Sequence, residues 1–438
     1  KQEQTAKSPL THLRNVIHLS ISFYFLFFAY GAAQGYLTTL LKKRLAFYTL
    51  ATIYSAIIFS SLLFAGPMVQ VFTPKWALFI GALGYSTFVG TCLKPEYYSL
   101  LPAAGILGFL GAALWAAQGA YLTAAAANYS KAKGIPVSAS MGLFTGIFFA
   151  VFQAAVLCGN VAGALTFLIL DKKKNHSSPA NILFTVYLVS TGIGAFIFIF
   201  LPVEKNPEKK QSDSMIQKLT NTMKMFLDIR FNLLIPVMVY SGLEQGFIFG
   251  DFSGHVVSPV LGKEHVGFVF AVFGVADALA SVIFGRLADR YGKRLLVIIG
   301  FICHAGFLSY FTFYIQYSGV PMLKIFKSRT WTLYAWAVLW GVGDATIGNG
   351  FPNTILSVFF TKNSEAAFAN FKIWQSLGYV IAFLWGPDLT IPLKSLILLA
   401  VLIFSCVCIG FTDCFVQRID GTPDSLESEE NKKEILHD

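Results

Sequence analysis

The sequence predicts an all-α polytopic membrane protein with twelve transmembrane helices in two parallel six-helix bundles. Of its 438 residues, 55% are hydrophobic and only 13% are charged, and the mean hydropathy is +0.62. Soluble domains carry about 25% charged residues, so this composition excludes a chain of soluble domains. In addition, a short loop sequence occurs once in each half of the chain, which indicates an internal repeat.

Twelve apolar stretches are long enough to cross roughly 30 Å of hydrocarbon as helices. They cover residues 16–40, 48–72, 76–93, 99–125, 140–170, 182–202, 231–252, 264–287, 295–316, 330–350, 365–386 and 391–412. They lack the alternation of a barrel strand, and within lipid only helices and closed barrels satisfy the backbone. The twelve stretches therefore predict twelve helices.

One long polar connection divides the stretches into six and six. The expected segments are an N-terminal six-helix bundle (1–202), a cytosolic central loop (203–230), a C-terminal six-helix bundle (231–412) and a cytosolic acidic tail (413–438). Within the central loop, Met215 to Ile229 could form an amphipathic surface helix. The first apolar stretch is long enough to span and is expected to be retained.

The basic residues of the connections favour an orientation with both termini in the cytosol. This orientation places the sequon Asn175-His176-Ser177 outside, where Asn175 could be glycosylated. The plasma membrane and the endolysosomal membrane both fit this multi-pass topology. Most Lys and Arg lie in short loops, so the net charge of +10 does not indicate nucleic-acid binding.

The repeated loop is intact in the second half of the chain. It reads Gly285-Arg286-Leu287-Ala288-Asp289-Arg290-Tyr291-Gly292-Lys293-Arg294, and its worn copy is Gly66-Pro67-Met68-Val69-Gln70-Val71-Phe72-Thr73-Pro74-Lys75. Small Gly285 permits close helix contact, Asp289 can pair with an arginine or cap a helix, and Arg290, Lys293 and Arg294 suit a cytosolic loop.

This loop resembles the motif that joins helices two and three, and eight and nine, in major facilitator proteins. The resemblance implies a conformational latch formed by Gly285, Asp289, Arg290, Gly292, Lys293 and Arg294. The alternative is that any short inside loop is basic. In the first copy Gln70 replaces the acid and Thr73 the second glycine, so a latch is expected in the second half.

Two further pairs of motifs support the repeat. Gly31-Ala32-Ala33-Gln34-Gly35-Tyr36 matches Gly242-Leu243-Glu244-Gln245-Gly246-Phe247, and Leu114-Trp115 matches Leu339-Trp340. Corresponding helices match in the same order and the same direction across the membrane. The two halves are therefore expected to be parallel and related by an axis along the membrane normal.

Buried acids are confined to the second half. Before Asp171 the chain has only Glu3 and Glu96, and neither lies in a span. The second half places four carboxyls in spans: Glu244, Asp251, Asp277 and Asp344. A carboxylate in the bilayer costs at least a few kcal/mol, so it usually faces a cavity or a partner.

The functional hypothesis is that Glu244 and Asp344 line a central cavity and bind a proton or a cation. The alternative is that they pair internally with Asn, Gln, Lys372 or His304. Asp251, near the outer end of its helix, is expected to be wet.

The first half offers neutral polar side chains instead. Gln34, Gln118, Gln153 and Asn160 could bind a polar solute or join helices by hydrogen bonds. Gln245 is a further candidate, and Trp115 and Trp340 could stack on an organic ligand or pack against other side chains. No nucleophile, phosphate-binding or metal-ligand pattern is found, and no cysteine spacing suggests zinc. No enzyme activity, metal or cofactor is therefore expected.

Several short blocks, taken together in order and spacing, are similar to the Unc-93 family of the major facilitator superfamily. They include Leu13-Arg14-Asn15-Val16, Leu114-Trp115-Ala116-Ala117-Gln118-Gly119, Tyr240-Ser241-Gly242-Leu243-Glu244-Gln245-Gly246-Phe247 and Leu339-Trp340-Gly341-Val342-Gly343-Asp344-Ala345. The blocks resemble in particular those of the animal A-type members. The resemblance implies the major facilitator fold, but the family includes a potassium-channel regulatory subunit, a Toll-like receptor escort and members tied to potassium homeostasis.

Two functions therefore stay open. The first is a transporter of a small polar or ionic solute by alternating access, with coupling to a proton or cation. The second is a non-transporting regulatory or trafficking partner of another membrane protein, either an ion channel or a receptor. A solvent-connected cavity lined by the candidate residues would favour transport, whereas a core in which those residues bond one another would favour partnership.

Overall fold

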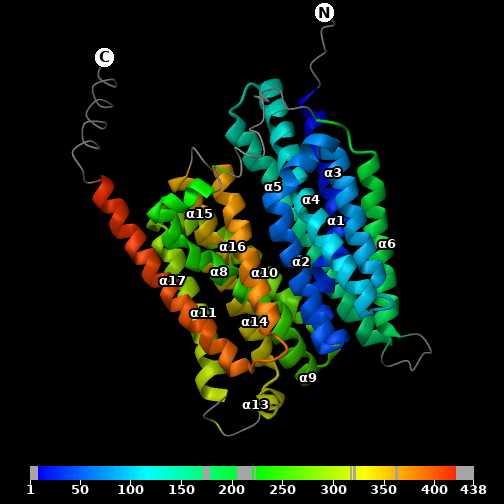
Figure 1. Cartoon of the computed structure of the whole chain (residues 1–438), viewed down its shortest axis with the longest axis vertical. Helices are drawn as coiled ribbons and strands as arrows, with labels where there is room; N and C mark the ends of the chain where they lie inside the picture. The colour runs from blue at the N-terminus through cyan, green and yellow to red at the C-terminus, as the bar shows by residue number, and fades with distance from the viewer. Residues whose placement is uncertain are drawn as a thin grey trace, which may run out of the picture.

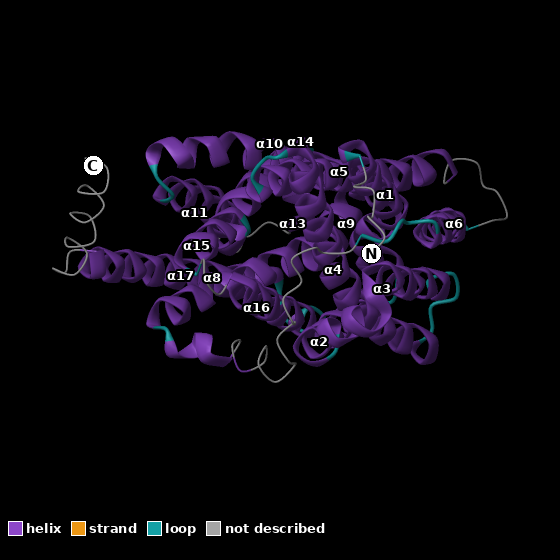
Figure 2. Ribbon diagram, turned by 90° about the horizontal axis from the view of Figure 1, so that it is seen from above, coloured by secondary structure: helices purple, strands orange, loops and turns teal. Residues whose placement is uncertain are grey.

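The computed structural model describes residues 8–170, 178–204, 220, 223–315, 318, 322–360 and 364–420. In this part of the chain every regular element is a helix (Figure 2). The glycosylation candidate Asn175 lies outside the described residues, as do residues 205–219 of the central loop and the tail beyond Asp420. The predicted all-α architecture is confirmed.

The first half contains six helices. They are α1 (Pro9–Leu40), α2 (Lys43–Leu63), α3 (Ala65–Thr91), α4 (Tyr97–Lys133), α5 (Val137–Leu170) and α6 (Pro179–Ile199). The second half has more breaks. Its elements are η2 (Met225–Leu227), α8 (Ile229–Gly246), η3 (Phe247–Val257), α9 (Ser258–Leu261), α10 (Lys263–Tyr291), α11 (Arg294–Ser309), η4 (Tyr310–Tyr314), α13 (Met322–Ser328), α14 (Trp331–Gly343), η5 (Asp344–Gly348), α15 (Gly350–Phe359), α16 (Ser364–Trp385) and α17 (Ile391–Asp420).

Several crossings of the second half combine more than one element. The segments α8–η3–α9, α11–η4 and α14–η5–α15 each run as one rod, because η3, η4 and η5 are π-helical insertions. Nine described helices are long and apolar enough to span on composition alone. The kinked α3, the short α14 and the more polar α16 are recognised as crossings by their place among the others.

The two halves stand side by side, with the long helices running between the same two ends of the molecule and α17 inclined to the others (Figure 1). The helix α1 begins, and α17 ends, at the same end of the molecule, which we call the terminal end. The opposite end, which carries α9 and α13, is called the α9 end. Because each crossing reverses direction, both copies of the repeated loop lie at the terminal end.

Glycines allow equivalent helices to touch in both halves. A Cβ on Gly159 of α5 would overlap the carbonyl oxygen of Phe28 in α1. At the matching place in the second half, a Cβ on Gly378 of α16 would overlap the carbonyl oxygen of Val239 in α8. The same backbone approach recurs half a chain later, so the predicted repeat is present in the packing as well as in the sequence.

A buried carboxylate ties three helices of the first half together at the terminal end. Glu204, just after α6, accepts hydrogen bonds from Asn15 (2.5 Å) and Asn128 (2.8 Å), and His12 Nδ1 lies 2.8 Å from its Oε1. Two of these partners belong to α1 and one to α4. Glu204 is only 5% exposed, so this set of bonds fixes the chain where it leaves the first half.

In the described part of the expected amphipathic helix Met215–Ile229, Thr220, Met223 and Lys224 are helical, and a short 3₁₀ turn, η2, follows before extended Asp228 and the start of α8 at Ile229. At the other end of the second half, α17 continues to Asp420, beyond the apolar part that ends at Thr412.

The two copies of the repeated loop share an unusual backbone conformation. Gly292, between α10 and α11, has φ 92° and ψ 155°, and Thr73, its counterpart within α3, has φ 64° and ψ 157°. Glycine adopts this region at little cost, whereas other residues are strained there by about 1–3 kcal/mol. The first copy therefore keeps the turn although it has lost the glycine. The side chain of Asp289 lies outside the described part of the structure.

Thr73→Gly is expected to stabilise the protein by about 1 kcal/mol, because the strain relieved exceeds the extra entropy lost by glycine on folding. Gly292→Thr is the reciprocal variant and should destabilise it. Thermal unfolding of the purified protein in detergent measures both. A lower melting temperature for Thr73→Gly would contradict the assignment of strain.

Candidate functional site

The candidate site is a polar cluster in the second half, formed by α8, η5, α14 and α16. Glu244, in the middle of the α8–η3–α9 rod, is 0% exposed. Its Oε2 accepts a hydrogen bond from the indole of Trp340 at 2.6 Å, while Oε1 has no hydrogen-bond partner among the described residues. A buried carboxylate oxygen without a donor is costly, because its lost hydration is not replaced.

Trp340 is held in turn by His304, which is itself bonded to Tyr240. Its carbonyl oxygen accepts a hydrogen bond from His304 Nε2 at 3.2 Å, and His304 Nδ1 lies 2.8 Å from the hydroxyl of Tyr240. A carbonyl only accepts, so Nε2 carries the proton and Tyr240 donates to Nδ1. The His304 ring also lies against the Trp340 indole, with centroids 4.6 Å apart, and this contact supports the orientation of the indole toward Glu244.

Asp344 receives its hydrogen bonds on one oxygen. Its Oδ1 accepts from Gln245 Nε2 at 3.0 Å and from Asn349 Nδ2 at 2.7 Å. Asp344 opens the π-helical segment η5, whose wide turn also brings the Asn349 backbone N–H to the Asp344 carbonyl oxygen. π-helical segments are frequent at functional sites because they redirect side chains out of the regular helical register.

Gly348 leaves the space in which the two carboxylates meet. A Cβ at this position would lie 2.5 Å from Asp344 Oδ1 and 3.0 Å from Glu244 Oε1. The oxygen of Glu244 that lacks a donor therefore lies near the oxygen of Asp344 that has two. Two acidic side chains from different helices point to one small, buried space.

A second layer of amides continues from Asn349 toward the terminal end. Gln375 Nε2 donates to Asn349 Oδ1 at 3.0 Å and to the Ser241 hydroxyl at 2.8 Å. Gln375 Oε1 accepts from the Lys372 ammonium at 2.9 Å. Lys372 is an exposed residue, whereas Glu244 and Asp344 are buried, so the network links the Lys372 ammonium to the buried acids.

The site touches the first half through two stacked tyrosines. Gln245 Oε1 accepts a short hydrogen bond from the Tyr379 hydroxyl, and Gln34 Nε2 donates to the Tyr54 hydroxyl at 2.6 Å. The rings of Tyr54 and Tyr379 stack with centroids 3.9 Å apart and planes inclined by 10°. Gln34 and Gln245 occupy matching positions of the repeat, so each half presents one glutamine and one tyrosine to this bridge.

The structure brings together Glu244, Trp340, Asp344 and Gln245, and it reaches Gln34 through the tyrosines. The other candidates lie elsewhere. Gln153 donates to Asp277 at 3.3 Å between α5 and α10, and Asn160 donates to the Val156 carbonyl of its own helix at 2.9 Å. Gln118 is buried in α4. Trp115 packs among aromatic rings of the first half, including Phe23, Phe27 and Phe152. Its counterpart Trp340 also packs on aromatic rings, those of Phe247 and Phe307, and in addition donates to Glu244.

Sequence reasoning missed Tyr54, Tyr379, Asn349, Gln375 and Ser241. The polar side chains in apolar stretches were a usable signal for Asn349 and Gln375. The sequence carried no such signal for Tyr54 and Tyr379. Tyrosine is common in apolar helices, and the pairing of these two rings depends on how α2 packs on α16.

The expectation that Asp251 is wet is wrong. Asp251 in η3 is 0% exposed, and its Oδ1 lies 2.6 Å from the ammonium of Lys394, which is also fully buried. His255 Nδ1 lies 3.0 Å from the same oxygen, and Lys394 also donates to the Gly386 carbonyl at 2.8 Å. Lys394 was unassigned because it comes from α17, far away in sequence.

Contacts between the halves gather on the α9 side of the site. Thr38 and Ser253 hydroxyls lie 2.9 Å apart, and the Tyr36 hydroxyl accepts from the Gly267 N–H at 3.1 Å. The ring of Phe47 from α2 stacks on His255, with centroids 5.8 Å apart. The first half is therefore docked on the second half by the ends of α1 and α2 at the α9 end.

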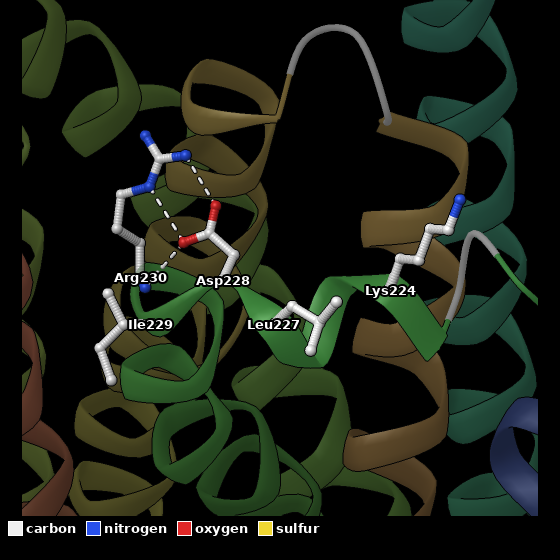
Figure 3. A pocket seen from close by; sticks show the side chains of 5 residues that line it. All are labelled: Lys224, Leu227, Asp228, Ile229 and Arg230. Carbon is white, nitrogen blue, oxygen red and sulfur yellow. Dashed lines mark hydrogen bonds and ion pairs between the residues drawn. The ribbon is translucent and has the colours of Figure 1, made fainter.

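The residues around the start of α8 line a hollow at the terminal end (Figure 3). This hollow has a volume of about 560 Å³ and is lined by Lys224, Leu227, Asp228, Ile229 and Arg230. Asp228 accepts from the Arg230 backbone N–H at 2.9 Å and from its guanidinium at 2.7 Å, so it caps the helix that carries Glu244.

The Arg230 guanidinium holds the pKa of the Asp228 carboxyl below its usual value. The stability that this cap contributes is therefore present at neutral pH and is lost as the pH falls through the lowered pKa.

With this geometry in place, comparison with known proteins identifies the family. The model of a family described as "Ion channel regulatory protein UNC-93" matches residues 39–410. The chain belongs to this family. The resemblance inferred from the sequence blocks is confirmed.

Relatives within the family cover nearly the whole chain. "UNC93-like protein 3" from Arabidopsis thaliana is 31% identical and covers 97% of this chain and 91% of its own length. "Protein unc-93 homolog A" from Bos taurus is 30% identical, with coverage of 89% and 91%. "Putative potassium channel regulatory protein unc-93" from Caenorhabditis elegans is 23% identical and covers 91% of this chain and 60% of its own length.

Solved structures show the fold. The nucleoside transporter NupG matches 93% of this chain and 100% of its own, with a TM-score of 0.60 and 12% identity. A bacterial homologue of the human drug peptide transporters PepT1 and PepT2 matches 94% of this chain and 99% of its own, with a TM-score of 0.65 and 12% identity. The Unc-93 chain therefore has the twelve-helix major facilitator fold, as predicted.

Gly348→Ala is expected to destabilise the protein by about 1–3 kcal/mol, because the added methyl group overpacks the space between Glu244 and Asp344. Gly274→Ala is the matched control, since a Cβ there meets nothing within 4 Å. Thermal unfolding compares the two. Equal melting temperatures for the two variants would show that the carboxylates do not meet at Gly348.

Lys394→Met is expected to cost about 3–5 kcal/mol of stability, because it leaves Asp251 buried without its ammonium partner. The double variant Asp251→Asn with Lys394→Met removes both charges and should recover much of the loss. Thermal unfolding of the single and double variants measures the difference. A double variant less stable than Lys394→Met alone would contradict the pairing.

Proposed function

We propose that this Unc-93 protein moves a small polar or ionic solute by alternating access, with the Glu244–Asp344 cluster binding the solute or a coupling cation. The observation that carries the proposal is a pair of carboxylates directed at one buried space, with one oxygen lacking a donor. Carboxylates in a membrane core are costly and are usually retained for binding or proton relay. A positively charged guest at this space would offset that cost.

The position of the cluster supports the same function. In parallel two-half transporters, the solute binds near the bilayer midplane between the halves, and one half rocks against the other. The cluster lies in the middle of the α8–η3–α9 rod and meets the first half through Tyr54 and Tyr379. The contacts of Thr38, Tyr36 and Phe47 close the α9 side, while Lys372 on the other side of the cluster remains exposed.

The orientation belongs to the proposal as well. With both termini in the cytosol, the terminal end faces the cytosol, and the side closed by Phe47 faces outward or into an organelle lumen. The cluster would then be reached from the cytosol through the exposed Lys372. The plasma membrane and the endolysosomal membrane both remain compatible with this arrangement.

A second candidate function is regulation of an ion channel. It is favoured by the description of the family as ion channel regulatory and by the name of the Caenorhabditis elegans relative. Partnership is also compatible with the polar side chains of the core, because most of them bond one another, as in the set Gln245, Asp344, Asn349 and Gln375. Such a protein would use the fold to contact a channel within the bilayer.

The test is ion flux through the purified full chain in phosphatidylcholine–phosphatidylglycerol vesicles. Pyranine fluorescence reports protons, and rubidium-86 uptake reports a potassium-like cation. We expect wild-type flux above that of protein-free vesicles, reduced at least about tenfold by Glu244→Gln and Asp344→Asn, because the lost charge removes more than 1.4 kcal/mol of cation binding. Glu96→Gln, an exposed carboxyl outside the site, is the control.

Flux that is unchanged in Glu244→Gln and Asp344→Asn would overturn the assignment of the site. Absence of wild-type flux, combined with a whole-cell potassium current that changes on expression and is indifferent to Glu244→Gln, would instead favour channel regulation.

A further inference from the structure

We propose that Gln245 couples the binding of a monovalent cation, either a proton or an alkali metal ion, at Glu244 and Asp344 to the Tyr54–Tyr379 contact between the halves. This inference rests on the proposed function and assigns the residue that transmits occupancy of the site. Gln245 is a positioning residue in this scheme, because it acts through the tyrosines.

The site lacks positive charge and one hydrogen-bond donor. The charged groups described in this hydrogen-bonded network are Glu244, Asp344 and Lys372, and Asp277 lies beside it, bonded to Gln153. Carboxylates therefore outnumber ammonium groups. Glu244 Oε1 is fully buried without a donor and lies close to Asp344 Oδ1, across the space left by Gly348. One added positive charge between these two oxygens would satisfy both.

Two hydrogen bonds set the orientation of the Gln245 amide. Its NH₂ group donates to Asp344 Oδ1 and its carbonyl accepts from the Tyr379 hydroxyl. The carboxylate only accepts, so the NH₂ group must face Asp344, and the carbonyl that is left facing Tyr379 can only accept from its hydroxyl. Gln245 therefore links the charge state of Asp344 directly to the hydroxyl of Tyr379.

A bound cation would weaken the hydrogen bond between Gln245 and Asp344. A proton or metal ion on Asp344 Oδ1 competes with the Gln245 N–H for the same lone pairs. Charge-assisted hydrogen bonds are about twice as strong as neutral ones, so the amide loses its best partner and is free to rotate. Rotation withdraws the carbonyl from Tyr379, and the ring of Tyr379 then loses the bond that holds it against Tyr54.

The Tyr54–Tyr379 stack lies at the boundary between the two halves. Tyr379 belongs to α16 and Tyr54 to α2, and these helices pack on one another across the halves. Tyr54 is held by Gln34, which is the counterpart of Gln245 in the repeat. The stack thus rests on one glutamine from each half, and only the glutamine of the second half is bonded to a carboxylate of the site. Loss of that support would favour opening of the α9 side.

Besides Glu244 and Asp344, further titratable groups face the cluster from the elements packed against it. They are Tyr54 of α2, Tyr240 of α8, Asp277 of α10, His304 of α11, Lys372 and Tyr379 of α16, and Cys406 of α17. Because of these groups, a response to pH has to be assigned by variants and not by its midpoint.

The experiment measures opening of the α9 end in the full chain. Arg44 and Asp388 are exposed residues of opposite halves, with Nη2 and Oδ1 3.5 Å apart. Cysteines at these two positions, in a Cys158→Ser background in nanodiscs, carry spin labels for distance measurement by double electron–electron resonance. One arm changes pH at constant salt. The other replaces N-methylglucamine chloride by potassium or sodium chloride at constant pH.

We expect the wild-type distance distribution to shift toward longer distances in at least one arm. Glu244→Gln and Asp344→Asn should remove that response because they alter the site. Tyr379→Phe keeps the ring but loses the hydroxyl that binds Gln245, and it should remove most of the response. Gln245→Leu should do the same. Tyr187→Phe is the matched control, since this buried tyrosine donates to the Gly159 carbonyl within the first half, and it should respond as wild type does.

The outcomes separate the two proposals. If the site variants lose the response and Tyr379→Phe responds fully, the coupling through Gln245 is overturned and the binding site stands. If the wild type responds in neither arm, or if Tyr187→Phe loses the response as Tyr379→Phe does, the coupling is likewise overturned. Should Gln245→Leu fail to fold, Tyr379→Phe, which preserves ring packing, still decides.

Discussion

Two buried carboxylates that point to one space are the constraint on which the second half of the molecule depends. Glu244 and Asp344 come from different crossings, and each needs donors that an apolar core does not supply. The surrounding sequence provides them: Trp340 for Glu244, and Gln245 and Asn349 for Asp344. The π-helical turn of η5 and the missing side chain of Gly348 bring the acids together. The missing donor at Glu244 Oε1 is the observation from which we propose that a positive charge binds here.

The first half has a different design. It packs Trp115 among phenylalanines and carries no acid in its described helices between Pro9 and Leu170. Its polar contribution at the boundary is Gln34 with Tyr54, and its ring at Phe47 closes the α9 side. The repeat thus preserved helix packing, visible at Gly159 and Gly378, while the chemistry of the two halves diverged. The first half thus has no acid in those described helices, whereas the second half combines a carboxylate pair with π-helical insertions. Our proposal that the second half responds to occupancy rests on this difference.

Much of the fold could be predicted from the sequence because its signals are local. Each apolar stretch must become a helix in lipid, and the loop motif and the Gly-x-x-Gln-Gly pairs report the repeat directly. The candidate acids and Gln245 were found for a similar reason, since any polar group in an apolar stretch stands out. Asp251 was misjudged because its burial depends on Lys394, a residue that approaches from another helix. At Thr73 the sequence misled in another way, because the loop motif is broken there and yet the backbone turn is still present.

The sequence by itself determined the membrane-spanning, all-helical, two-half architecture and the family, because those follow from hydrophobicity and from short blocks read along one chain. Only the tertiary structure decided which polar groups meet. Tyr54 with Tyr379, Gln375 with Asn349, and Lys394 with Asp251 are pairs brought together by the packing of helices distant in sequence. Helix packing angles and π-helical insertions set those meetings, and neither leaves a periodic signal in the residues themselves.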